Sequence, residues 1–295
     1  MYAIGSRSGK HEIWKYSISS QSWSVSPTQP APLMAPSIPY CSKHHALTVY
    51  QSQPVFIGGY VQKSVNNFTS SKRIYMFNED CGWKEDVDVI PPLPAIEDIT
   101  LNFVSASSEG NHLIVAWEEG GEVKLLCFDG QKWKRREGPR WSNNGVYKIS
   151  LIIRKGIVVL TQHCSLTLST IHRATLETLF ADASPSDAAS PSNVVIWKEM
   201  TNDNPPNLSN FTILGEQCII VAAVVNANPA PVTLDALVMT FKSFGYWNMI
   251  KKFEFCCQPD ACLSIVSLSG EMLLVMGMLK TQPGTIQKQF VFLKR

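Results

Sequence analysis

The feature that most constrains the fold of this chain is a strand pattern that recurs along its whole length. An apolar run of strand length, usually preceded by a polar turn, occurs six times at intervals of 44 to 62 residues. Repetition with a period of this size is typical of repeat folds. The runs read MYAIGS, PVFIGGY, HLIVAWE, GIVVLTQ, CIIVAAVV and MLLVMGML.

Each repeat contains more than its apolar run. A short strand closed by a polar or glycine turn precedes most runs, as in HHALTVYQSQ and LNFVSASSEG. A strand that ends in an aromatic residue follows most of them, and a tryptophan comes a few residues later, as in RIYMFNEDCGW. No long window has a helical period. The repeating unit is therefore four antiparallel strands. Its tryptophans are Trp23, Trp83, Trp133, Trp197 and Trp247.

Four-stranded antiparallel units of this period predict the blades of a β-propeller. One blade cannot bury both of its faces, whereas stacked blades cover the apolar faces of their neighbours. We therefore predict an all-β fold, a six-bladed β-propeller forming a single domain over residues 1–295, with the tryptophans wedged between blades. The predicted blades are residues 1–32, 42–94, 100–141, 146–201, 209–257 and 261–295.

Three repeats depart from the regular unit. The first opens on its apolar strand and lacks an inner strand, and the last stops after its third strand, so both blades are predicted to be incomplete. We expect roughly two further strands, about 20 residues, upstream of Met1. The fourth repeat reads LTLSTIHRATLETL as a strand and then carries ADASPSDAASPSN, which its composition predicts to be a surface loop.

The pattern resembles the kelch repeat. The best copy runs from His44-His45 through Gly58-Gly59 and Phe77 to Trp83. The resemblance implies a kelch-like propeller in which the glycine doublet and the tryptophans are structural. In the other repeats the doublet is replaced by Gly5-Ser6, Ala116-Trp117, Thr161-Gln162, Ala222-Ala223 and Met276-Gly277.

The resemblance also implies a function, because kelch-like propellers commonly bind a peptide or protein partner through loops on one face. The chain has no Walker loop, H-E-x-x-H, G-x-S-x-G or paired-carboxylate motif. We therefore predict a monomeric protein-protein interaction module that is not an enzyme and could form part of a larger adaptor. No individual contact residue is predicted. The candidate contact loops are residues 7–11, 62–72, 118–122 and 226–232.

The alternative is a propeller enzyme or a glycan-binding domain with a site at the central axis. It requires His, Tyr, Asp or Glu side chains that converge around the axis, and the fold alone cannot decide between the two functions. The stretch FDGQKW resembles the Asp box of sialidase propellers. We discount it, because Cys127 and Gln131 stand where that motif expects Ser or Thr and Gly.

Metal ions and cofactors are not predicted. The six histidines have no ligand-like spacing, and the three cysteines of FCCQPDACL form no C-x-x-C pair. The segment KWKRREGPRW could bind single-stranded nucleic acid through its basic and aromatic residues. We favour a solvated role that protects an exposed strand edge, because the preceding repeat has the opposite charge there.

Composition limits the partners and the compartment. The net charge of +2 indicates neither nucleic acid nor a membrane surface, and no apolar run has the length of a membrane helix. The first residues lack the basic start and apolar core of a signal peptide. Most of the eight cysteines sit singly in apolar strands, as reduced thiols do. We expect a cytoplasmic protein.

Overall fold

The chain folds into β-sheets throughout its described parts. The computed structural model describes residues 2–7, 10–17, 19–20, 22–25, 40–64, 67–70, 72–78, 80, 82–94, 102–140, 148–163, 169–181, 195–199, 208–214, 217–224, 232–240, 248–255, 263–269, 272–282 and 285–294. Contacts divide the chain into two compact units, Met1–Leu160 with His172–Lys198, and Thr161–Ile171 with Glu199–Arg295. Among the described residues, no helix is long and apolar enough to cross a membrane.

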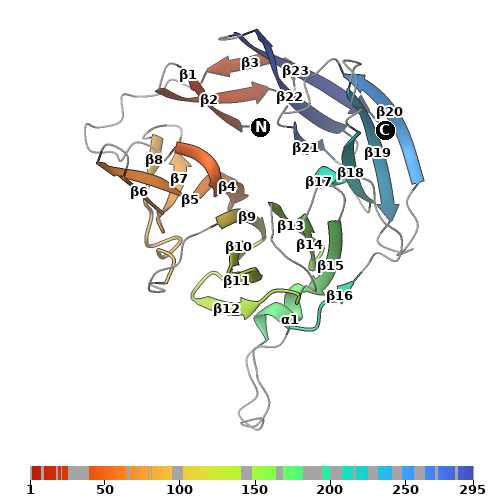
Figure 1. The fold of residues 1–295 in the computed structure, drawn as a ribbon. Coiled ribbons are helices and arrows are strands. Elements are labelled where there is room, and N and C mark those ends of the chain that lie inside the picture. Colours follow the sequence, from red (N-terminus) through yellow and green to blue (C-terminus); the bar gives the residue numbers. More distant parts are fainter. Residues whose placement is uncertain are drawn as a thin grey trace. The chain divides into compact units, whose positions relative to one another are not determined.

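Three sheets belong to the first unit, and their strands follow one another in chain order (Figure 1). The first sheet contains β1 (Tyr2–Arg7), β2 (Lys10–Ser17) and β3 (Ser22–Val25). The second contains β4 (Tyr40–Tyr50), β5 (Gln53–Ser64), β7 (Ile74–Asn78) and β8 (Gly82–Lys84), with β6 (Asn67–Ser70) paired to β5. The third contains β9 (Asn102–Glu109), β10 (His112–Glu119), β11 (Glu122–Phe128) and β12 (Trp133–Glu137).

In the remaining sheets, too, the strands follow one another in chain order. The fourth sheet, whose strands are shared between the two units, contains β13 (Lys148–Arg154), β14 (Ile157–His163), β15 (Ser169–Thr175) and β16 (Lys198–Glu199). The second unit adds a sheet of β17 (Leu208–Leu214), β18 (Gln217–Val224), β19 (Val232–Thr240) and β20 (Asn248–Phe255). Its last sheet contains β21 (Leu263–Ser269), β22 (Met272–Gln282) and β23 (Thr285–Lys294).

The structure confirms an all-β fold that contains several four-stranded antiparallel sheets. The six described sheets match the six predicted ranges to within two residues at their starts, and the first and last of these sheets have three described strands each. The number of blades stays a prediction. The polar insert of the fourth repeat, residues 182–194, lies outside the described residues.

One prediction of local structure is wrong. Residues 176–179, predicted as the end of a strand, lie in the short helix α1 (Leu176–Phe180). The hydroxyl of Thr175 accepts a hydrogen bond from the backbone N–H of Thr178 (3.2 Å) and caps the first turn. The negative charge of Glu177 in this turn interacts favourably with the helix dipole. The alternating pattern of β15 therefore ends at this cap.

The third sheet is buried on both faces, because side chains alternate along each strand. In β10, Leu113, Val115 and Trp117 pack with residues of β4, β5 and β7 in a cluster that we call the first core. Ile114 and Ala116, from the same strand, pack with residues of β13 and β14 in the second core. This alternation explains why β10 reads as a continuous apolar run.

The inner strands β9 and β13 lie side by side in different sheets and are joined by side chains. Every second side chain of β9 accepts a hydrogen bond from a backbone N–H group of β13 or of the turn that follows it. The spacing fits because alternate side chains of a strand point to the same side. An edge that would otherwise present free N–H groups is thereby covered. The acceptors and donors are Ser105 Oγ with Leu151 N (3.0 Å), Ser107 Oγ with Ile153 N (3.0 Å), and the Glu109 carboxylate with Lys155 N (2.6 Å) and Gly156 N (2.7 Å).

Two of the repeat tryptophans join neighbouring sheets. Trp133 Nε1 donates to the carbonyl oxygen of Pro91 (3.0 Å), and Trp197 Nε1 donates to that of Glu137 (3.2 Å). Each acceptor lies at or beyond the last strand of the preceding sheet. The tryptophans also pack against the first and the second core, respectively. The side chain of Trp23 and all of Trp247 lie outside the described residues.

The glycine doublet lies where the second sheet is irregular. Gly58 has a φ of 80°, which favours glycine, and its N–H donates to the carbonyl oxygen of Arg73 (3.2 Å). The pairing of β4 with β5 breaks between His45 and Tyr40 opposite this site. In the same sheet, the Trp83 ring lies 6.2 Å from the Phe56 ring.

Replacing both Ser105 and Ser107 with alanine tests the connection between β9 and β13. We expect the free energy of unfolding to fall by about 2 to 4 kcal/mol, because two partly buried N–H groups lose their acceptors. Chemical denaturation measures the change. The matched control is the S20A/S22A pair, exposed serines whose hydroxyls bond to each other. Equal stability of both double variants would contradict this role.

Candidate functional site

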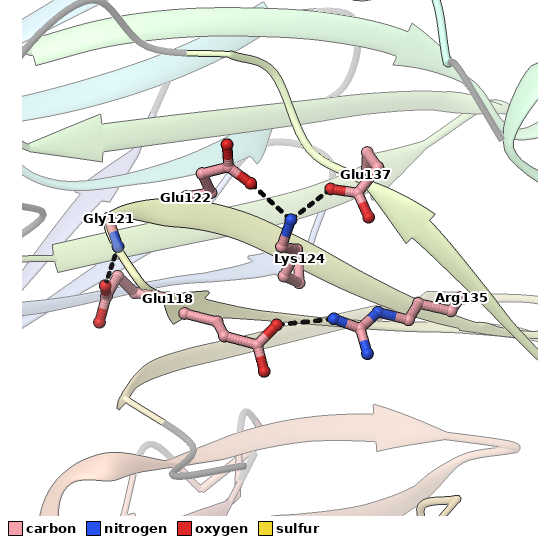
Figure 2. A network of polar contacts seen from close by, with 7 residues as sticks. Glu118, Gly121, Glu122, Lys124, Arg135 and Glu137 are labelled. Carbon is pink, nitrogen blue, oxygen red and sulfur yellow. Dashed lines mark hydrogen bonds and ion pairs between the residues drawn. The ribbon is translucent and has the colours of Figure 1, made fainter. Parts of the chain in front are cut away.

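The hairpin between β10 and β11 carries the best-defined polar cluster of the third sheet. Its turn is Gly120-Gly121, with φ values of 61° and 88°, as a two-residue hairpin requires. The N–H of Gly121 donates to Glu118 Oε1 (2.6 Å), which holds that carboxylate against the turn (Figure 2). The hairpin includes residues 118–122, the one predicted contact loop whose side chains are all described.

Lys124 joins two carboxylates beside this turn. Its Nζ lies 2.5 Å from Glu122 Oε2 and 2.5 Å from Glu137 Oε2, and Figure 2 shows the ammonium group between them. Glu137 is brought there by the pairing of β11 with β12, which sets it opposite Lys124. The Lys124 side chain is 13% exposed, whereas those of Glu122 and Glu137 are 61% and 47% exposed. A nearly buried cation thus fixes two exposed carboxylates.

The protonation of this cluster follows from its contacts. The hydrogen bond from Lys124 lowers the pKa of Glu122. Burial lowers the pKa of Lys124, but hydrogen bonds to Glu122 and Glu137 outweigh burial and raise it overall. Glu122 and Lys124 are therefore charged at neutral pH. An ionised carboxylate accepts hydrogen bonds but has no proton to give, so Glu122 is unsuited to be the general acid of a glycosidase.

Arg135 extends the cluster towards the first core. Its Nη2 lies 2.6 Å from Glu119 Oε2, and its guanidinium lies 5.9 Å from the centroid of the Trp117 ring. A guanidinium over an indole face is held by the charge distribution of the ring as well as by the ion pair. The cluster therefore combines four carboxylates with two cations: Glu118, Glu119, Glu122, Glu137, Lys124 and Arg135.

The structure corrects the role predicted for the basic segment 132–141. Arg136 is buried, and its guanidinium donates to the carbonyl oxygens of Leu179 (2.9 Å) and Ala181 (2.7 Å). Lys134 donates to the carbonyl oxygen of Phe180 (2.8 Å). These cations hold the C-terminal end of α1, where carbonyl groups lack helical partners. A solvated role is therefore wrong for these two residues.

The described histidine side chains serve packing. The His45 ring stacks on Phe56 (5.1 Å), and the His112 ring lies 4.5 Å from Phe180. Burial lowers the pKa of His172 to about 4, so this imidazole is neutral at physiological pH. Within the described ranges, no three His, Cys, Asp or Glu side chains are placed to hold a metal ion. Burial raises the pKa of the free Cys127 thiol to about 12, which leaves it unreactive.

Comparison of the chain with known proteins and solved structures identifies the class of its fold. No protein-family model and no curated protein matches the chain. It is similar in structure to a protein of unknown function from Dyadobacter fermentans, at 12% identity and a TM-score of 0.58, over 97% of this chain and 84% of that one. It is also similar to Trypanosoma rangeli sialidase, crystallised as a covalent intermediate with 2,3-difluorosialic acid, at 13% identity and a TM-score of 0.50. That match covers 97% of this chain and 49% of the sialidase. The chain has the fold of a β-propeller.

These findings overturn two predictions from the sequence, the protein-interaction module and the absence of enzymatic activity. The solved propeller of known activity reported above is an enzyme that acts on a sugar. The lack of a linear motif does not decide the function of a propeller, because propellers can collect site residues from separate loops.

The sequence predicts residues 118–122 as a contact loop but not the cluster of carboxylates and cations on it, although it contains a signal for that cluster. The run WEEGGEV sets glutamates on both sides of a double glycine, and a two-residue turn brings such residues to one hairpin end. Glu137 could be added only from the register of β11 with β12.

The buried His172 predicts a pH dependence of stability. Its pKa is lowered on folding, so below about pH 6.5 the unfolded chain takes up a proton that the folded chain accepts only near pH 4. The free energy of unfolding should therefore fall by up to about 3 kcal/mol between these values. Denaturation of H172Q from pH 7.5 to 4 should show a shallower slope. Equal slopes for H172Q and the wild type would refute this origin.

Proposed function

We propose that this chain is a carbohydrate-active β-propeller that binds a glycan at the β10–β11 hairpin. The observation that carries the proposal is the cluster of exposed carboxylates held in fixed positions around Lys124. The shared fold with a sialidase supports the class of ligand. Together they favour a propeller enzyme or glycan-binding domain.

The chemistry of the cluster suits sugar hydroxyl groups. A hydroxyl group donates one hydrogen bond and accepts others, so carboxylate oxygens and a guanidinium can be its partners. Hydrogen bonds to ionised groups are stronger than neutral ones. Glu122 and Glu137 supply exposed acceptors, and Arg135, 40% exposed, supplies donors. Lys124 reduces the entropy that these side chains would lose on binding, because it already holds both carboxylates.

Charge indicates which sugars fit. The four carboxylates of the cluster outnumber its two cations and the nearby Arg140, whose charge also acts on Glu122, so the net charge there is negative. A sugar that carries its own carboxylate would be repelled, whereas a neutral sugar would not. We therefore assign recognition of a neutral glycan to this hairpin, in contrast to the anionic sugar bound by the sialidase.

Two predictions from the sequence remain part of the proposal. Kelch membership is supported by the positive φ of Gly58 and by the packing of Trp83 against Phe77 (5.3 Å). A cytoplasmic location is supported by the free, buried thiol of Cys127.

Substitution of Glu122 and Glu137 tests the proposed function. A glycan array with neutral and sialylated oligosaccharides, followed by calorimetry, should identify a neutral ligand for the wild-type protein. E122Q and E137Q should each weaken its binding about tenfold, since loss of a charge-assisted hydrogen bond costs about 1.5 kcal/mol or more. Hydrolysis of 4-nitrophenyl glycosides by the same proteins would show whether the bound sugar is also cleaved.

The matched control is E177Q, which changes an exposed glutamate of α1 in the same way. It should leave glycan binding unchanged. Wild-type protein that retains no oligosaccharide from the array, and cleaves none of the glycosides, would refute the proposed function.

A further inference from the structure

One face of β4 carries two exposed apolar side chains. Leu47 is 39% exposed and Val49 is 54% exposed, and they are the fourth-last and second-last residues of the strand, before the two-residue turn Gln51-Ser52. β13 is also followed by a two-residue turn, and the residues at the same distances from it are Leu151 and Ile153. These are only 4% and 5% exposed, because they pack in the second core. The fourth sheet thus buries two positions that the second sheet exposes.

The strand β9 shows what kind of segment lies along such an edge. Ser105 and Ser107 accept hydrogen bonds from two N–H groups of β13, at 3.0 Å each. The carboxylate of Glu109 accepts from both N–H groups of the turn Lys155-Gly156, at 2.6 and 2.7 Å. The segment beside β13 is therefore extended and carries the alternating pattern Ser-x-Ser-x-Glu.

The turn after β4 has the conformation that holds this carboxylate. The φ values are 47° and 66° in Gln51-Ser52, and 50° and 72° in Lys155-Gly156. Successive N–H groups of such a turn can form a concave site for an anion. The turn after β9 is different: Gly110 has a positive φ but Asn111 does not, and the carbonyl oxygen of Asn111 accepts a hydrogen bond from the hydroxyl of Tyr50 (3.2 Å). The conformation of the Gln51-Ser52 turn thus indicates a carboxylate as its partner.

The backbone groups of this edge point away from β5. Val49 lies opposite Pro54, which has no N–H group, and the carbonyl oxygen of Val49 accepts a hydrogen bond from the Ser108 hydroxyl of β9 instead. Leu47, two residues earlier, has the same orientation, because paired and outward-facing residues alternate along an antiparallel strand. Of the described strands, only β5 and β9 pack closely against β4, and β9 lies on the opposite face, where Ala46 joins the first core.

We propose that this face of β4 binds an extended segment of a partner protein that has the pattern Ser/Thr-x-Ser/Thr-x-Asp/Glu. The hydroxyl groups of the segment accept hydrogen bonds from the N–H groups of Leu47 and Val49, and its carboxylate accepts from those of the Gln51-Ser52 turn. Hydrogen bonds to an ionised acceptor are the stronger ones, so the acidic residue fixes the register. Within the described residues the complete pattern occurs only at Ser105–Glu109, which is already bound to β13, so another polypeptide must supply the segment. This site is separate from the β10–β11 hairpin, and the inference goes beyond the proposed function.

The experiment uses the full chain and, as a probe, a fluorescent peptide blocked at both ends with the sequence of residues 103–110, FVSASSEG. Fluorescence anisotropy should show saturable binding. An E109Q peptide and an S105A/S107A peptide should each bind about tenfold more weakly, because the first loses the charge of its acceptor and the second loses two acceptors. Equal affinity of the three peptides, or no saturable binding of FVSASSEG, would overturn the inference. The protein is unaltered in this comparison, so a folding defect cannot decide it.

Protein variants locate the site. V49E puts a negative charge beside the turn and should weaken binding of FVSASSEG about tenfold by repulsion of its glutamate, whereas V49K should not weaken it. The matched control is V87E, because Val87 is also 54% exposed and lies outside β4, and it should bind as the wild type does. Wild-type affinity of V49E would contradict the inference. Sedimentation of the protein without peptide tests a second copy as the occupant: a dimer that V49E dissociates would assign this face to self-association and overturn the proposed partner.

Discussion

The packing of the third sheet against the fourth depends on how the inner edge of β13 finds hydrogen-bond partners. A four-stranded sheet has two free edges, and stacking apolar faces does not satisfy them. Between β9 and β13, alternate polar side chains of one strand bond to alternate N–H groups of the next. The same strand turns Val104 and Ala106 to the first core. The apolar residues of β9 thus pack towards the second sheet, and its polar residues bond to the fourth sheet.

Much of this fold could be predicted, because its signals are local. The period of two, the turn glycines and the recurring tryptophans predict the strands and their grouping. The helix α1 could not be predicted in the same way. Its apolar residues, Leu176, Leu179 and Phe180, have a helical spacing, but five residues are too few to show a helical period, and the cap at Thr175 sets where the strand ends. The hydrogen bonds from Arg136 to Leu179 and Ala181 join residues more than 40 positions apart, so no local sequence pattern predicts them.

The functional prediction went wrong for a related reason. The absence of a catalytic motif was taken to indicate an interaction module, but a propeller distributes its polar residues over hairpins of different sheets. Glu122 and Glu137 meet only because β11 and β12 pair in one register. The solved structures show the fold alone, and the proposed ligand class depends on the charges and contacts of Glu122 and Glu137.

The two-sided burial of β10 has a consequence for how such a chain can change during evolution. Loss or gain of a single residue within this strand would turn Leu113 and Val115 towards the second core and Ile114 towards the first, so both cores would lose their packing at once. Insertions are tolerated only where the alternation has ended. The hairpin tips are therefore the part of the chain that is free to acquire new chemistry, while the strands between them vary only by substitution.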